Sequence, residues 1–145
     1  MSKISIKIEG VDELFADLKR LGAISEDAVV DTLNDIADDT KQLAVDGIKQ
    51  GPASGRTYTR GSVTRRASEA GEYPMSDTGR LMGSIRSIEA SKALPQAVIG
   101  TDLIYGAHLE FGTSKMEARP WLERSFIKAA KGVETELKAK LEGKL

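Results

Sequence analysis

The chain of 145 residues contains no cysteine, a single histidine and few aromatic side chains. The lack of cysteine excludes disulfides and thiolate metal sites, and one histidine excludes both Cys–His catalytic pairs and multi-histidine metal centres. No apolar run approaches the roughly 20 residues that span a bilayer, and the first residues lack the apolar core of a signal peptide. We therefore expect a protein made in the cytoplasm, with no cofactor, no metal and no contact with a membrane.

Neither sign of charge dominates the chain, because 21 lysines and arginines face 22 aspartates and glutamates, for a formal net charge of −1. This balance gives no bulk electrostatic basis for DNA binding. The charges are nevertheless separated along the sequence: acids gather in residues 25–50, and basic residues gather in 51–80 and in the C-terminal tail. Each run is either a solvated surface or one side of a contact in which acidic and basic surfaces of neighbouring copies meet.

Patterns that carry catalysis are missing from the sequence. A Ser-His-Asp triad would have to use the one histidine, His108, but the sequence contains no Gly-x-Ser-x-Gly motif for the nucleophilic serine. Adjacent carboxylates such as Asp38 and Asp39 point in different directions on a helix and so do not form an acid–base pair. The glycine-rich central stretch lacks the spacing of a phosphate-binding loop. We predict that the protein is not an enzyme and has no catalytic residues.

Hydrophobic periodicity predicts a single α+β domain over residues 1–145. Ile4, Ile6 and Ile8 alternate with polar residues, which is typical of a half-buried strand. Helices are expected at 12–22, at 25–50 and, after a short helix at 104–111, from Pro120 to near the C-terminus. Further strands are expected through Ile88 and at 97–100. The expected fold is a small, mostly antiparallel sheet packed against two long amphipathic helices.

The core is expected to come from the apolar stripes of the two long helices and from three aromatic side chains. The first stripe is Val29, Leu33, Ile36, Leu43 and Ile48. The second stripe is Leu122, Phe126, Ala129, Val133, Leu137 and Leu141. The aromatic side chains are Tyr105, Phe111 and Trp121.

Residues 51–77 lie between the periodic regions and are rich in glycine, proline and arginine. A loop of this length in a small domain is usually functional or disordered, and this one has too little apolar surface to offset its ordering entropy. We expect it to be mobile until a neighbouring subunit or a nucleic acid orders it. The residues predicted to contact a partner are Arg56, Tyr58, Arg60, Arg65, Arg66, Arg80, Lys115 and Met116.

Binding of a nucleic acid is the alternative function for the arginine-rich loop. Its arginines could hold phosphates while Tyr58 stacks on a base. The loop also contains acids, among them Glu69 and Glu72, and the chain has no helix–turn–helix or zinc-finger spacing.

A second motif is expected to form a structural corner before the final helix. Gly112 follows an aromatic residue at a helix end, where a left-handed cap conformation is expected. Glu110 and Arg119 flank this turn, and we predict that they pair across it. The tip at 115–117 either touches a neighbouring subunit or is only part of the corner.

Two sequence blocks resemble the neck, or tail-completion (head–tail joining), proteins of long-tailed double-stranded-DNA bacteriophages. The first is RASEAGEYP at 66–74 with DTGRL at 77–81 and SI at 84–85. The second is IGT at 99–101, YG at 105–106, LEFGTSKM at 109–116 and ARPWL at 118–122. The chain departs from the family pattern at Ala70, where proline is common, and at Arg65 or Arg66, where histidine is frequent.

This resemblance implies a structural virion or prophage protein, made in the bacterial cytoplasm and located in the neck or tail. It implies a ring of copies, by family likeness a hexamer, whose other partners are the adjacent head-connector and the tail-terminator or tail-tube proteins. DNA would pass through the lumen without specific binding. In such a ring the acids of the 25–50 helix, including Asp31, Asp35, Asp38 and Asp39, line the lumen, lie on the outer surface or meet the basic loop of a neighbour.

Overall fold

A computed structural model describes residues 4–8, 26–76 and 78–142 of the chain. Its helices are α2 (Glu26–Gln50), α3 (Arg80–Ser84), α4 (Ile104–Phe111), α5 (Leu122–Ala130) and α6 (Val133–Glu142). Its strands are β1 (Ile4–Ile8), β2 (Thr57–Arg60), β3 (Val63–Arg66), β4 (Arg86–Ile88) and β5 (Ala97–Thr101). The expected helix at 12–22 lies outside the described residues, as does Ser25. The α+β class is confirmed.

The main sheet has three antiparallel strands in the order β1-β5-β4. Ile6 of β1 lies opposite Ile99 of β5, and Ser87 of β4 lies on the other side of Ile99. Alternate residues of β5 are buried, which gives the sheet one inner face. The strands expected at Ile4–Ile8, through Ile88 and at 97–100 are therefore confirmed.

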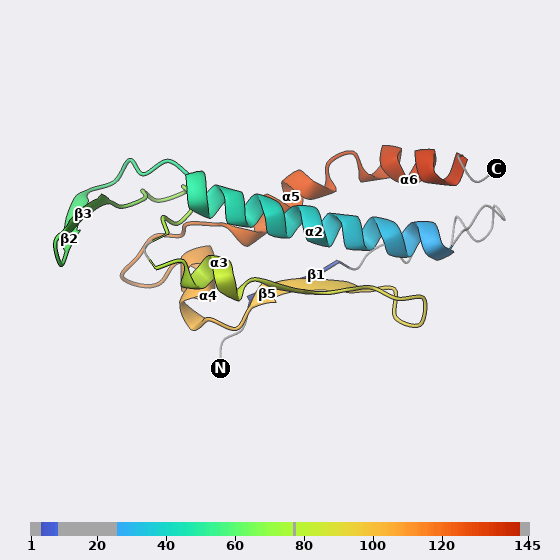
Figure 1. Cartoon of the computed structure of the whole chain (residues 1–145), viewed down its shortest axis with the longest axis horizontal. Coiled ribbons are helices and arrows are strands. Elements are labelled where there is room, and N and C mark those ends of the chain that lie inside the picture. Colours follow the sequence, from blue (N-terminus) through green and yellow to red (C-terminus); the bar gives the residue numbers. More distant parts are fainter. Residues whose placement is uncertain (1–3, 9–25, 77, 143–145) are drawn as a thin grey trace.

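The long helix α2 runs between the sheet and α6, so the molecule is layered (Figure 1). Its buried residues recur every three or four positions, from Ala28 to Ile48. Two of them are threonines, Thr32 and Thr40, whose hydroxyls donate to the carbonyls of the residues four positions earlier at 2.7 and 2.6 Å. The acids of α2 lie on its exposed side, as expected.

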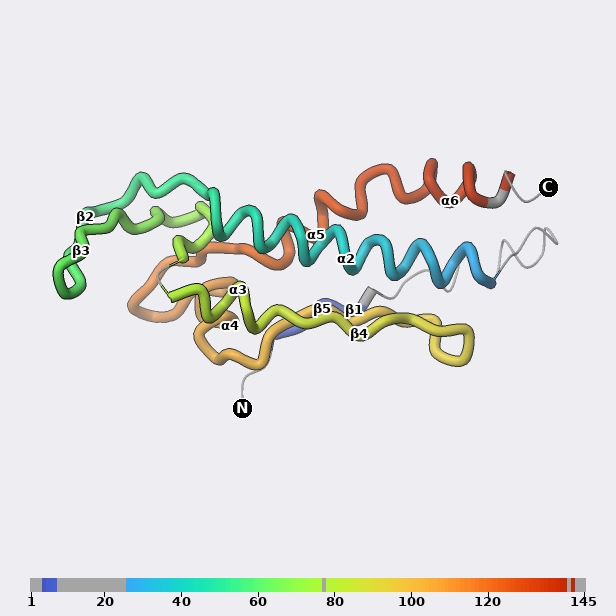
Figure 2. Tube along the Cα trace, in the orientation of Figure 1, coloured from blue at the N-terminus to red at the C-terminus, as the bar shows by residue number. Residues whose placement is uncertain are grey.

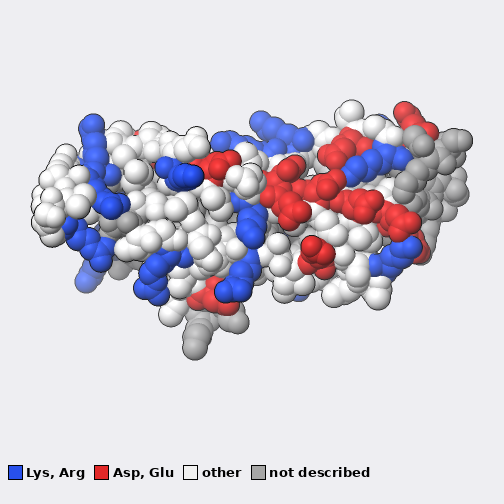
Figure 3. All heavy atoms as spheres, in the orientation of Figure 1, with Lys and Arg blue, Asp and Glu red and all other residues white. Residues whose placement is uncertain are grey.

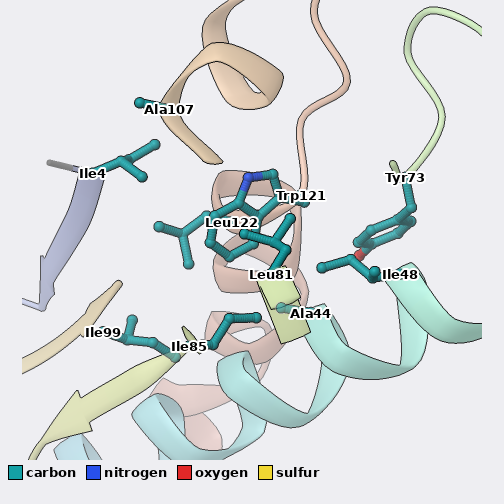
Figure 4. Close-up of a cluster of buried hydrophobic side chains, with 10 residues drawn as sticks. All are labelled: Ile4, Ala44, Ile48, Tyr73, Leu81, Ile85, Ile99, Ala107, Trp121 and Leu122. Atoms are coloured by element: carbon teal, nitrogen blue, oxygen red, sulfur yellow. The ribbon is translucent and has the colours of Figure 1, made fainter. Parts of the chain in front are cut away.

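The larger part of the core gathers around Trp121, whose side chain is fully buried. Figure 4 shows it among Leu81, Ile48 and other side chains from the sheet, α2 and α5. The indole Nε1–H donates to the carbonyl oxygen of Gly106 at 2.9 Å. A Cβ on Gly106 would come within 2.7 Å of a Thr101 methyl group, so this close approach requires glycine.

The final helix is not continuous, contrary to expectation. The chain leaves α5 after Ala130, and α6 begins at Val133, because Gly132 adopts a left-handed conformation with φ 80°. Pro120 precedes α5 instead of lying in its first turn.

Two of the three expected core aromatics are also exposed, contrary to expectation: Tyr105 is 39% and Phe111 is 74% exposed. The reason is that α4 turns Gly106, Ala107 and Glu110 inward, which places Tyr105 and Phe111 on other sides of the helix.

Residues 51–77 are not a loop without secondary structure, because β2 and β3 pair there as an antiparallel hairpin. The hairpin lies at one end of the elongated molecule, and the β4–β5 turn lies at the other (Figure 2). The predicted mobility of this segment stays a prediction.

Candidate interaction surface

The arginine hairpin, which we define as residues 54–67, has one basic face. Because directly opposed residues share a face of a hairpin, the pairing of Tyr58 with Arg65 and of Arg60 with Val63 places these side chains together. Arg56 joins them, since it lies two positions before Tyr58 in the strand direction. The other face carries Thr57, Thr59, Thr64 and Arg66.

The arginine hairpin is strongly charged and exposed. It contains four arginines and no aspartate or glutamate, and all of its strand residues except Tyr58 are exposed. Blue lysine and arginine side chains gather at this end of the molecule in Figure 3. A two-stranded hairpin is marginally stable on its own in water, so contacts at its base are needed to hold it.

Polar contacts close the base of the hairpin. Arg66 donates from Nε to the carbonyl of Gly55 at 2.8 Å and from Nη2 to the carbonyl of Ser54 at 3.2 Å. The Glu72 carboxylate accepts hydrogen bonds from the Ser54 hydroxyl and from the Glu69 N–H, the latter at 2.8 Å. The hydrogen bond from Ser54, followed by that from Glu69, lowers the pKa of Glu72. Arg66 is thus engaged within its own chain.

Tyr73 anchors the same segment in the core. Its ring lies against Gly47 of α2, where a Cβ would come within 2.4 Å of the ring. Its hydroxyl is 3.0 Å from the Ser125 hydroxyl of α5. The Arg124 guanidinium lies 4.9 Å from the ring centroid and donates to the carbonyl of Gly71 at 2.7 Å. The hairpin therefore leaves the core from a fixed point.

The corner before α5 is built on Glu110, which is only 5% exposed. Its carboxylate accepts the backbone N–H groups of Trp121, Leu122 and Glu123 at 2.7, 2.8 and 3.0 Å. These are the donors that the first turn of a helix leaves without a partner. A negative charge at this position also suits the helix dipole. Gly112 ends α4 with φ 74°, a value that favours glycine. Its ψ of 177° is extended, however, so the expected left-handed cap conformation is not formed.

The predicted pairing of Glu110 with Arg119 is wrong. The carboxylate of Glu110 is used by the start of α5, and Arg119 turns instead toward the base of the hairpin. Its Nε donates to the Ser68 hydroxyl at 3.0 Å, and its Nη2 donates to the Ser68 carbonyl at 3.0 Å. The corner and the arginine hairpin are consequently joined by one side chain.

Two hollows bring most of the predicted interface residues together. A groove of about 670 Å³ lies between the hairpin and the 113–119 loop. Its lining includes Arg56, Tyr58, Lys115, Met116 and Arg119. A second hollow of about 300 Å³ is lined by Arg60, Arg80 and Tyr105, among others. Pro74, Met75 and Leu109 line both hollows, so the two are neighbours.

One part of this surface was missed by sequence reasoning. Ile104, Tyr105 and Phe111 leave an apolar patch on α4, with exposed fractions of 46%, 39% and 74%. The exposed His108 lies between them. The signal was the spacing 104, 108 and 111, which places these positions on one side of a helix, opposite the small residue Gly106.

The described residues show no arrangement that suggests metal or membrane chemistry. They contain no group of three or more histidine, cysteine, aspartate or glutamate side chains placed to hold a metal ion. None of their helices combines the length and the apolar character needed to cross a membrane.

Comparison of the chain with protein-family models, with curated proteins and with solved structures found no match. The resemblance to phage neck proteins therefore depends on the two sequence blocks. Both blocks contain residues that build or support the surface just described: the first contains the hairpin base and its buried anchor Tyr73, and the second contains the corner and the buried Trp121.

Proposed function

We propose that this chain is a structural component of a phage or prophage virion, which assembles with itself into a ring at the head–tail junction. The observation that carries the proposal is the arginine hairpin. It is charged and exposed, and it is held in place at its base by Tyr73 and Arg119. Such a projection needs a partner surface to bury it, and an oligomer supplies one.

A structural role agrees with the chemistry of the surface. The lining of the hollows includes arginine, lysine, methionine and tyrosine side chains, with Glu69 and Glu117 among the other residues of the larger one. Buried Glu110 is occupied by three backbone donors, which leaves it in a capping role and not in an acid–base role. Ring assembly requires rigid walls and complementary surfaces, and α2 with its covering helices offers the wall.

A protein partner fits the surface better than a nucleic acid does. Apolar side chains lie beside the arginines: Val63, which pairs with Arg60, is 49% exposed, and Met75, which lines both hollows, is 39% exposed. Contact of apolar side chains with a protein is what drives association in most protein interfaces. Nucleic-acid grooves instead pair cations with aromatic stacking along a continuous path, and the described hairpin offers Tyr58 alone for stacking.

The proposal is tested by the mass of the purified protein, alone and mixed with candidate head-connector and tail proteins. We expect a closed species of defined copy number in native mass spectrometry, and rings in negative-stain images. The double variant Arg56→Ala/Arg60→Ala should lose this species. Lys131→Ala/Lys138→Ala, which removes two exposed lysines near α6, is the matched control and should retain it.

The same purified proteins distinguish ring assembly from the alternative function, which is nucleic-acid binding. We expect negligible affinity for duplex DNA at physiological salt in both the wild type and the arginine variant. Measurable affinity that falls steeply as salt rises would instead indicate phosphate binding by the hairpin, and would favour the nucleic-acid-associated module. A protein that stays monomeric with every mixture would contradict the ring.

A further inference from the structure

The turn between β4 and β5, which we define as residues 90–96, presents one apolar side chain on a fixed backbone. The Leu94 carbonyl accepts the N–H groups of Ser91 and Gln96 at 2.9 and 2.8 Å. The Leu94 N–H donates to the Ser91 hydroxyl at 3.1 Å. Pro95 restricts the backbone further, because its ring fixes φ. The Leu94 side chain is nevertheless 58% exposed. This turn is therefore ordered by its polar contacts and not by burial of its leucine.

Two contacts tie the turn to the first part of α2. The Ala90 N–H donates to Asn34 Oδ1 at 2.7 Å, and Asn34 Nδ2 donates to the Ala90 carbonyl at 3.3 Å. Lys92 pairs with Asp27 at 2.8 Å. A segment that is held in place before binding loses little conformational freedom on binding. Leu94 is thus an aliphatic side chain on a rigid support, which suits it to fill a pocket in a protein partner.

The groove between the arginine hairpin and the 113–119 loop offers a matching apolar site. Its lining includes Tyr58, Met75, Leu109 and Met116. Met75 is exposed and the other three are half-buried, so apolar surface is open to solvent here. The groove volume of about 670 Å³ lies within the range of about 300–1,000 Å³ that ligand pockets occupy. Methionine side chains also adapt to the shape of what they bind.

The turn and the groove cannot meet within one copy. The turn lies at one end of the elongated molecule, and the arginine hairpin lies at the other (Figure 2). Between them runs α2, whose 25 residues span about 37 Å at about 1.5 Å per residue. Two surfaces at opposite ends of the same molecule can contact each other only between copies.

Charges of opposite sign accompany the two surfaces. The groove lining contains more cations than acids: Arg56, Lys115 and Arg119 against Glu69 and Glu117. Around the turn, the described residues contain more acids than cations: Glu26, Asp27 and Glu89 against Lys92. Complementary potentials steer two surfaces together and fix their register. The affinity itself comes from the burial of apolar surface.

We propose that the 90–96 turn of one copy binds in the groove of the next copy, with Leu94 against Met75 and Met116. The contact joins different surfaces of the two copies, so it is heterologous and repeats from copy to copy. Heterologous contacts close into rings when the rotation between copies allows it, and otherwise form open chains. The inference rests on the proposed self-assembly and names its two surfaces.

Two single changes test the two surfaces separately. Leu94→Asp alters the turn, and Met75→Asp alters the groove. Each should weaken association by about tenfold or more in sedimentation experiments, because a carboxylate replaces an apolar side chain that the contact buries. The matched control is Ile127→Asp on α5, which puts the same charge in place of another apolar side chain, itself 52% exposed, and should leave association unchanged. Circular dichroism should show that all three variants are folded, because each replaced side chain is exposed.

A mixture of the two variants tests whether the contact is heterologous. The Leu94→Asp copy keeps an intact groove, and the Met75→Asp copy keeps an intact turn, so a single unaltered contact can form between them. At concentrations where each variant alone stays monomeric, we expect dimers that contain one copy of each, and nothing larger. Larger assemblies in the mixture, or monomers alone, would overturn the proposal.

Cysteine cross-linking gives an independent measurement, because the chain has no cysteine of its own. Ala93→Cys places a thiol in the turn, and Lys115→Cys places one at the groove. Oxidation of the chain that carries both changes should give a ladder of covalent oligomers. The chain with Ala93→Cys and Lys131→Cys, whose second thiol lies at the end of α5, should give none. A ladder in both chains, or in neither, would contradict the contact.

The outcomes also separate this contact from the proposed function. Rings that join heads to tails as well in both single variants as in the wild type would refute the contact alone. A wild-type protein that gives neither a ring nor a ladder would refute both.

Discussion

Replacing Glu110 by alanine should destabilise the protein more than almost any other single change at the corner. The change removes the acceptor of three backbone N–H groups at the start of α5. The Trp121 and Leu122 side chains are fully buried, so water cannot readily take its place at these two donors. A buried donor left without a partner costs about 1–3 kcal/mol. We therefore expect the free energy of unfolding to fall by about 3–5 kcal/mol, out of the 5–15 kcal/mol that is typical of small proteins.

The assay is urea unfolding followed by the fluorescence of Trp121, the only tryptophan in the chain. Its indole is buried beside the corner and so reports on this site directly. With a slope of about 1–3 kcal/mol per molar urea, a loss of this size moves the midpoint by more than about 1 M. Glu110→Gln keeps one acceptor oxygen, and we expect it to cost about 1–2 kcal/mol.

The control is Glu117→Ala, which removes an exposed carboxylate from the same loop and should change the stability by less than about 0.5 kcal/mol. If Glu110→Ala were no more destabilising than this control, the three hydrogen bonds would not be what holds α5 to α4, and the account of the corner would be wrong.

Three further changes test the surroundings of this site. Gly112→Ala should lower the melting temperature, because φ is 74° and a Cβ would come within 2.9 Å of backbone atoms, whereas helical Gly83→Ala meets nothing and should stabilise by about 0.5–1 kcal/mol. Arg119→Ala should speed tryptic cleavage in the arginine hairpin by about tenfold, since it loosens the base. In the wild type this hairpin should still be cut before α2. Uniform resistance of a monomer to trypsin would contradict the predicted mobility of the hairpin. The pKa of Glu72 is lowered from 4.5 on folding, so its carboxylate stabilises the folded state above pH 4.5, and this stabilisation is lost as the pH falls through the folded pKa. The amide shift of Glu69, measured by NMR, should titrate in that range and should stop doing so in Glu72→Gln.

The regular elements could be predicted because their burial follows one simple period. Alternation at Ile4, Ile6 and Ile8 indicated β1, and apolar residues every three or four positions indicated α2. The break at Gly132 could not be predicted in this way, because one glycine between two apolar stripes is also tolerated inside a continuous helix. Only the left-handed conformation of Gly132, with φ 80°, decides it.

The hairpin was missed although its signal was present. Thr57–Arg60 and Val63–Arg66 contain β-branched residues and are separated by two residues, beginning with Gly61, which is a recognised hairpin pattern. The lack of apolar side chains hid it, since strands are usually recognised by a buried face. The exposure of Tyr105 and Phe111 was hidden for the opposite reason, because aromatic residues are buried more often than not.

The contacts that position the candidate surface were beyond the reach of the sequence. The distance along the chain from Ser68 to Arg119 is 51 residues, and no local pattern relates them. The sequence pointed to Glu110 and Arg119 as partners in one corner, but Glu110 caps α5 and Arg119 bonds Ser68. A carboxylate can accept hydrogen bonds from backbone N–H groups as readily as from a guanidinium. Which donors Glu110 takes depends on where α5 begins.

The same contacts decide how the hairpin can act. Tyr73 is held by Ser125, and Arg119 holds Ser68, so the segment leaves the core in a set direction. A projection fixed at its base loses less conformational freedom on binding than a free loop does, and more of its contact energy is then available for association. Its strand residues remain exposed, and only a partner can bury them. A rigid base with an unburied tip is what repeated assembly of identical copies requires, because each copy must present the same surface at the same angle to the next.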